Sequence, residues 1–153
     1  MLEVACKNSP TETVLSGTLH ALKLANEGLN ASGVKTTLLE LPYAFHSAQV
    51  DPILESYRVL AGSVTYKRPQ IPILSPLTGE IVREAGIIDT DYLVRHARET
   101  VDFCAALSTS ASDELGVGKN SLGGSPLTAN SLKKGENNWK TISSSIGSIY
   151  NAG

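Results

Sequence analysis

The sequence predicts an α/β protein in which short strands alternate with amphipathic helices. The chain has 153 residues, which is enough for one modest domain with a real hydrophobic core. Its composition, 41% hydrophobic and 18% charged, is ordinary for a soluble globular protein. Short runs of β-branched and apolar residues are separated by stretches in which apolar residues recur with the period of a helix.

The first 41 residues predict a strand–strand–helix–strand unit. Residues 2–6 and 13–15 have the composition of short strands, and Asn8-Ser9-Pro10 between them is typical of a turn. Thr18 is placed to cap a helix whose apolar positions are Leu19, Leu22, Ala25 and Leu29. Residues 34–41 are β-branched and then leucine-rich, which predicts a third strand. This order is typical of ferredoxin-like subdomains.

Two helices and two short strands are expected in the next segment. Asp51 is expected to cap the first helix, with Pro52 in its first turn and Gly62 at its end. Asp89-Thr90 is expected to cap the second, which runs to about Glu99. The remaining elements are two short strands and the start of a last helix, at residues 71–75, 81–83 and 101–107.

The composition changes at Ser108. Residues 108–131 are rich in Ser, Gly, Thr and Asn, which predicts a loop or disorder because too little apolar surface is available to offset the entropy of ordering. A helical pattern returns in residues 139–150.

Several classes of function are disfavoured by the bulk composition. A net charge of −2 argues against a nucleic-acid partner, and no apolar run reaches the roughly 20 residues that cross a membrane. Cys6 and Cys104 are too few for a disulfide framework or a zinc site, so we expect buried free thiols and a cytoplasmic location. Three widely separated histidines predict no metal site.

His46 is the main candidate for chemistry. It follows Pro42-Tyr43-Ala44-Phe45 in a loop just before the expected helix, and loops anchored to rigid elements commonly hold reactive side chains. Imidazole titrates near neutrality, so it can accept and return a proton within one turnover. By chemistry alone, a structural or surface histidine is the more frequent case.

The run LPYAFHSAQVDPIL resembles the histidine segment of malonyl-CoA:acyl-carrier-protein transacylases, and its PYAFHSAQ form is most similar to fungal non-reducing polyketide synthases. Further resemblances occur in the same order along the chain. They are ACKNSP with VLSG, ILSPLTG, YLVRHARETVDF, and the segment from Leu132 to Gly153. Residues 2–107 and 132–153 therefore carry the resemblance.

The resemblance implies a partial acyltransferase fold: a ferredoxin-like small subdomain (1–41) and the C-terminal part of an α/β-hydrolase-like core (42–107). A low-complexity segment (108–131) and a post-acyltransferase linker (132–153) would follow. It implies His46 as general base, Asn8 near the active site, and Phe45 favouring malonyl over α-branched units. Malonyl-CoA and the phosphopantetheine of an acyl carrier protein would be the substrates, with no bound cofactor. The partners would be that carrier protein and the rest of a multidomain synthase.

The chain departs from the family pattern in three places, of which the smallest is that Thr100 and Val50 replace the usual proline and methionine. It contains no Gly-x-Ser-x-Gly, the motif that carries the family's serine nucleophile and that the family places upstream, with the arginine that pairs with the malonyl carboxylate. The expected Gly-Pro-His-Pro is replaced by residues 108–131. We therefore expect the chain alone to be inactive. The alternatives are a starter-unit acyltransferase domain of the same synthases and a non-catalytic fragment.

Overall fold

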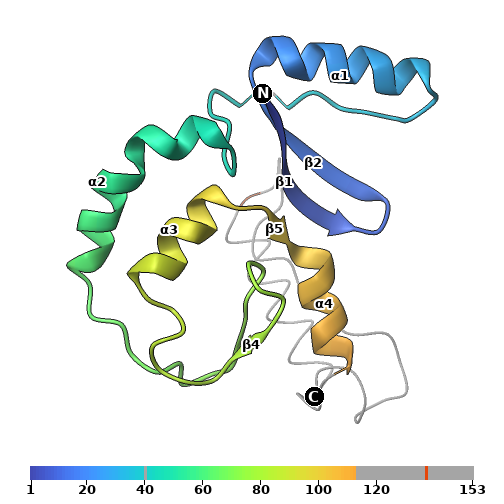
Figure 1. Cartoon of the computed structure of the whole chain (residues 1–153). Coiled ribbons are helices and arrows are strands. Elements are labelled where there is room, and N and C mark those ends of the chain that lie inside the picture. Colours follow the sequence, from blue (N-terminus) through green and yellow to red (C-terminus); the bar gives the residue numbers. More distant parts are fainter. Residues whose placement is uncertain (40, 113–136, 138–153) are drawn as a thin grey trace. The chain divides into compact units, whose positions relative to one another are not determined.

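The computed structural model describes residues 1–39, 41–112 and 137 (Figure 1). The chain divides into two compact units, Met1–Ser112 and Asp113–Gly153, and the fold below is that of the first. The helix expected at 139–150, the linker at 132–153 and most of the low-complexity segment lie outside the described residues.

A three-stranded sheet is built from both ends of the first unit. Its strands are β1 (Leu2–Ser9), β2 (Glu12–Gly17) and β5 (Val101–Asp102), in the order β2-β1-β5. β1 pairs antiparallel with β2 and parallel with β5, with Cys6 opposite Val101. The two predicted N-terminal strands are confirmed, and both are longer than expected. β5 brings the far end of the unit beside β1 (Figure 1).

Helix α1 (Leu19–Ala31) confirms the predicted cap, because the Thr18 hydroxyl accepts a hydrogen bond from the Ala21 N–H at 3.3 Å. The strand expected at 34–41 was wrong for the residues described there, which form no strand. The backbone hydrogen bonds found in this segment are local, such as that from Val34 N to Leu29 O. β-propensity does not produce a strand when no neighbouring strand supplies a ladder.

The His46 loop leads through a 3₁₀ turn, η1 (Ala48–Val50), into α2 (Asp51–Gly62). The expected cap at Asp51 was wrong. Val50 precedes the helix without a side-chain cap, and the capping side chain is Ser47, at the start of the 3₁₀ turn. Because that turn already begins the helical path, Asp51 lies in the first helical turn, where its charge is favourable. Pro52 lies there too, as predicted.

A short hairpin and a third helix follow. The hairpin pairs β3 (Ile73–Leu74) with β4 (Ile81–Val82), and Gly79 takes a φ of 72° in the turn between them. Helix α3 (Thr90–Arg98) begins as predicted, with the Asp89 carboxylate accepting the Tyr92 N–H at 2.8 Å. It packs against α2.

The final described helix, α4 (Phe103–Ser112), differs from expectation at both ends. It starts later, because Val101 and Asp102 pair with β1 as β5. It also continues through residues 108–112, where a loop or disorder was predicted. The Asp102 carboxylate accepts the Ala105 N–H at its start, and the Ser108 hydroxyl donates to Cys104 O at 2.9 Å. These local bonds satisfy polar groups within the helix.

Candidate active site

His46 lies in a tightly turned loop between residue 41 and η1. Its φ is 56°, in the left-handed region that non-glycine residues seldom adopt. Ser47, almost fully buried, donates its hydroxyl hydrogen to Ala44 O at 2.7 Å and accepts the Gln49 N–H. The serine thereby bridges the residues before and after His46. The loop conformation is set by Ser47 rather than by glycine.

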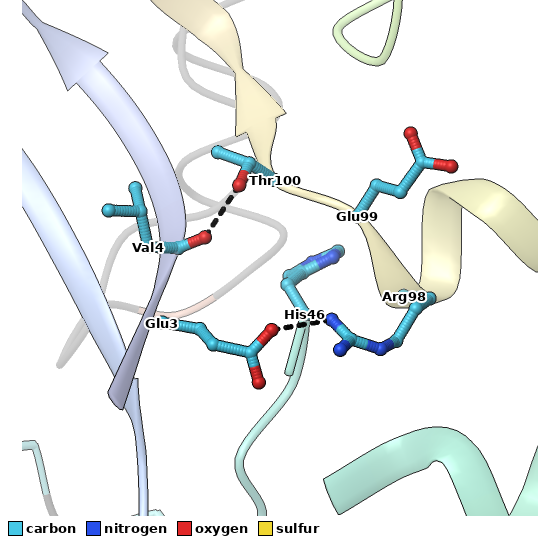
Figure 2. A pocket seen from close by; sticks show the side chains of 6 residues that line it. All are labelled: Glu3, Val4, His46, Arg98, Glu99 and Thr100. Carbon is cyan, nitrogen blue, oxygen red and sulfur yellow. Dashed lines mark hydrogen bonds and ion pairs between the residues drawn. The ribbon is translucent and has the colours of Figure 1, made fainter. Parts of the chain in front are cut away.

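A cavity of about 470 Å³ opens beside His46 (Figure 2). Three segments supply its walls: the start of β1, the His46 loop, and the end of α3 with the link to β5. The lining residues are Glu3, Val4, His46, Arg98, Glu99 and Thr100. Both acidic and basic side chains therefore share the cavity with the imidazole.

The imidazole of His46 packs against a second aromatic ring. Its ring meets that of His96 edge-on, with centroids 6.0 Å apart and planes at 90°. Tyr92 in turn stacks on the His96 ring, with the two ring centroids 5.9 Å apart. The Nδ1 atom of His46 is buried and has no hydrogen-bond partner within residues 1–39 and 41–112. Buried polar atoms without a partner are uncommon, and a catalytic role is one of the explanations for them.

His96 is a second titratable group at the site. Burial lowers the pKa of its imidazole, and the neighbouring His46 lowers it further. A neutral His96 does not oppose a positive charge forming on His46 as strongly as a protonated one would. Sequence reasoning missed His96 as a site residue, because nothing local in the sequence shows its proximity to His46.

Thr100 closes the cavity beside β1. Its hydroxyl donates to Val4 O at 2.7 Å (Figure 2). The resemblance places a proline here, which has no group able to make this bond. The substitution therefore adds a tie between the end of α3 and β1.

The two predicted substrate-binding residues are not brought into the cavity. Asn8 lies at the hairpin end of β1, where its amide donates to Glu12 and its carbonyl oxygen accepts from Cys6 Sγ. Phe45 is 53% exposed and packs on Tyr43, with ring centroids 5.9 Å apart. Their assigned roles remain predictions.

Comparison with known proteins places this geometry in a family. The family model described as "Acyl transferase domain" matches residues 1–133. The chain belongs to the acyl transferase domain family. Its fold is accordingly that of part of an α/β acyl transferase, as the sequence predicted.

Fungal non-reducing polyketide synthases match the whole chain. Non-reducing polyketide synthase Preu8 of Preussia isomera is 45% identical over 170 residues, covering 100% of this chain and 8% of that protein. Non-reducing polyketide synthase PKS1 of Zymoseptoria tritici is 46% identical, again covering 100% of this chain and 8% of that protein. The chain thus spans a small part of the relatives that it matches.

Solved acyl transferase structures agree with the fold. The acyltransferase domain from the second module of the salinomycin polyketide synthase superposes with a TM-score of 0.76 at 28% identity, covering 97% of this chain and 38% of that one. The acyl transferase domain of SpnD, in complex with 2-(pent-4-yn-1-yl)malonyl, gives a TM-score of 0.79 at 25% identity, covering 99% of this chain and 41% of that one.

The described part of the chain has neither a membrane-spanning helix nor a metal-ion site. None of its helices is long and apolar enough to cross a membrane. No group of three or more histidine, cysteine or acidic side chains there is arranged to hold a metal ion. Cys6 donates to Asn8, and burial raises the pKa of its thiol, so it lacks the thiolate character of a reactive cysteine.

Proposed function

We propose that this chain forms part of an acyltransferase domain that transfers malonyl from coenzyme A to an acyl carrier protein, with His46 as general base. The observation that carries the proposal is the placement of His46. Its imidazole lies beside a cavity, on a loop held in a left-handed turn, and its buried Nδ1 has no partner among the described residues. Membership of the acyl transferase family supplies the reaction class.

In the proposed reaction a serine hydroxyl attacks the malonyl thioester and His46 takes its proton. The carbon–sulfur bond breaks, and the imidazolium returns the proton to the departing coenzyme A thiol. The malonyl group is then on the serine ester. The phosphopantetheine thiol of the carrier protein attacks that ester, with His46 again taking a proton and returning it to serine.

The serine is not supplied by the described loop. Ser47 adjoins His46, but its hydroxyl hydrogen is committed to Ala44 O. Backbone N–H groups would stabilise the oxyanion in this reaction class. We therefore assign the base to this chain, and the resemblance assigns the nucleophile to a Gly-x-Ser-x-Gly motif that this sequence does not contain.

Carrier-protein transfer is supported by one structural neighbour. A malonyl-transacylase, solved in complex with a type II polyketide synthase acyl-carrier protein, superposes with a TM-score of 0.67 at 25% identity, covering 77% of this chain and 38% of that one. The second candidate, a starter-unit acyltransferase, shares fold and base. The two candidates differ in the acyl group that they accept.

The test supplies the intact synthase with radiolabelled malonyl-CoA, acetyl-CoA or hexanoyl-CoA and follows the label to the carrier protein. To isolate this domain, each ester is compared in the wild type and in His46→Ala. The proposal expects His46-dependent loading from malonyl-CoA. Dependence on His46 for acetyl or hexanoyl loading only would establish the starter-unit reading. Loading that is independent of His46 for every ester would contradict both.

A further inference from the structure

We infer that Glu3 and Arg98 form a clamp that fixes the His46 loop against β1 and so positions the imidazole. The two residues are 95 positions apart in sequence, yet both line the cavity beside His46 (Figure 2). They are proposed as positioning residues and not as proton carriers. The kinetic part of this inference rests on the proposed function.

Glu3 uses its two carboxylate oxygens for two different segments. Oε1 accepts the backbone N–H of Ala48 at 2.7 Å, and Oε2 accepts from Arg98 Nη1 at 2.8 Å. Ala48 follows His46 by two residues, so the first bond ties the His46 loop directly to β1. Both bonds lower the pKa of the Glu3 carboxyl, the Ala48 N–H having the larger effect, and this keeps the group ionised near neutral pH.

Arg98 extends this tie to the start of α2. Its Nε donates to Asp51 Oδ1 at 2.6 Å while Nη1 binds Glu3. The guanidinium therefore joins the end of α3, the start of β1 and the first residue of α2. The fixed fork of arginine suits two carboxylates at once, which a lysine ammonium on a flexible stem matches poorly.

The clamp is more sheltered than three other arginine ion pairs of the described residues. Side-chain exposure is 29% for Arg98 and 24% for Glu3. The pairs Arg58–Asp91, Arg68–Glu84 and Arg95–Glu99 have both partners at least 43% exposed. Sheltered pairs are screened less by salt and constrain geometry better than exposed ones.

The His46 loop needs such a constraint. A non-glycine residue at a φ of 56° persists only where the surroundings hold it there. Glu3 and Arg98 hold the segment just after the strained residue, and Ser47 holds the segment just before it. Because Arg98 already contacts two protein carboxylates, it is better suited to this structural role than to binding a substrate carboxylate.

The test measures structure and kinetics separately. In the full 153-residue chain, hydrogen exchange of the Ala48 amide is compared among wild type, Glu3→Ala, Glu3→Gln and Arg98→Gln. In the intact synthase, kcat and KM for malonyl transfer are measured for the same variants. Arg58→Gln is the matched control, because it removes an arginine–carboxylate pair between the same two helices, α2 and α3, away from the His46 loop.

Glu3→Ala should expose the Ala48 amide to exchange at least about tenfold faster, and Glu3→Gln, which keeps an acceptor oxygen, should do so less. Arg98→Gln and Glu3→Ala should lower kcat roughly 10- to 100-fold with KM changed less than about threefold, as small misplacements of a catalytic group do. Arg58→Gln should stay within about twofold of wild type.

Unchanged Ala48 exchange in Glu3→Ala would overturn the clamp, as would a loss of kcat in Arg58→Gln equal to that in Arg98→Gln. If Glu3→Ala does not fold, Glu3→Gln and Arg98→Gln test the clamp instead, by the same measurements of Ala48 amide exchange and of kcat and KM. Failure of the proposed function would show differently, as normal transfer in His46→Ala while the Ala48 exchange result still stands.

Discussion

The imidazole of His46 meets that of His96 edge-on, with ring centroids 6.0 Å apart. Burial lowers the pKa of His96, and the neighbouring His46 lowers it further. The neighbour of the proposed base is thus kept neutral, and this has a consequence for stability.

We expect His96 to make folding stability depend on pH. Its folded-state pKa lies below the unfolded value of about 6.5, so the unfolded chain binds more protons between those two values. The contribution is therefore fully present above about pH 6.5 and is lost as the pH falls toward the folded pKa. Urea unfolding at pH 7.5 and 5.5 measures it. His96→Gln should lose less stability on acidification than wild type, whereas His20→Gln, at an exposed position on α1, should behave as wild type. Equal losses of stability on acidification in wild type, His96→Gln and His20→Gln would exclude this role for His96.

Ser47→Ala should destabilise the first unit by about 1–2 kcal/mol. The hydroxyl is buried, donates to Ala44 O and caps η1, and both bonds disappear in the variant. The free energy of unfolding from urea titration measures the effect. Ser63→Ala is the matched control, since Ser63 donates to Leu60 O at 2.7 Å from an exposed position. Ser63→Ala should lower the free energy of unfolding clearly less than Ser47→Ala does. A larger loss in Ser63→Ala than in Ser47→Ala would contradict the structural role of Ser47.

The 153-residue chain alone should not take up an acyl group. The serine beside the base has its hydroxyl hydrogen directed to Ala44 O, and catalysis by this route needs a nucleophile within hydrogen-bond reach of the base. Incubation with radiolabelled malonyl-CoA, with and without carrier protein, is the measurement. Stoichiometric labelling that disappears in Ser47→Ala would make Ser47 the nucleophile and overturn this expectation.

Phe45→Ala should relax the choice between malonyl and methylmalonyl units in the intact synthase. The resemblance implies that the Phe45 ring crowds the α-methyl group of a methylmalonyl unit. The resulting preference for malonyl should be about 1–3 kcal/mol. Competition between the two coenzyme A esters measures it, with Tyr43→Ala as the control because Tyr43 packs on Phe45. An unchanged ratio, or an equal change in the control, would remove Phe45 from the specificity of the site.

Local signals in the sequence predicted local structure well. The caps Thr18 and Asp89 and the first-turn Pro52 each act within a few residues, and all three are as expected. The predictions were wrong where pairing with a segment distant in the sequence determines whether a strand forms. Residues 34–41 lack a described strand to pair with, and β5 exists because Val101 meets Cys6 of β1.

The residues of the candidate site likewise divide into one that a local motif identifies and others that only the fold brings together. His46 was found because its motif is contiguous in sequence. Glu3 and Arg98 could not be found, because 95 residues separate them and neither belongs to a motif that signals an ion pair. His96 could not be found for the same reason, since only the fold brings α3 to the His46 loop.

The most direct test of the central claim is single-turnover malonyl transfer to the carrier protein by the intact synthase carrying His46→Ala. Loss of a general base should slow transfer by at least roughly 10²-fold, with malonyl-CoA binding retained. His20→Ala, on the exposed surface of α1, should transfer at the wild-type rate. Transfer by His46→Ala within about threefold of wild type would contradict the assignment of His46 as the base.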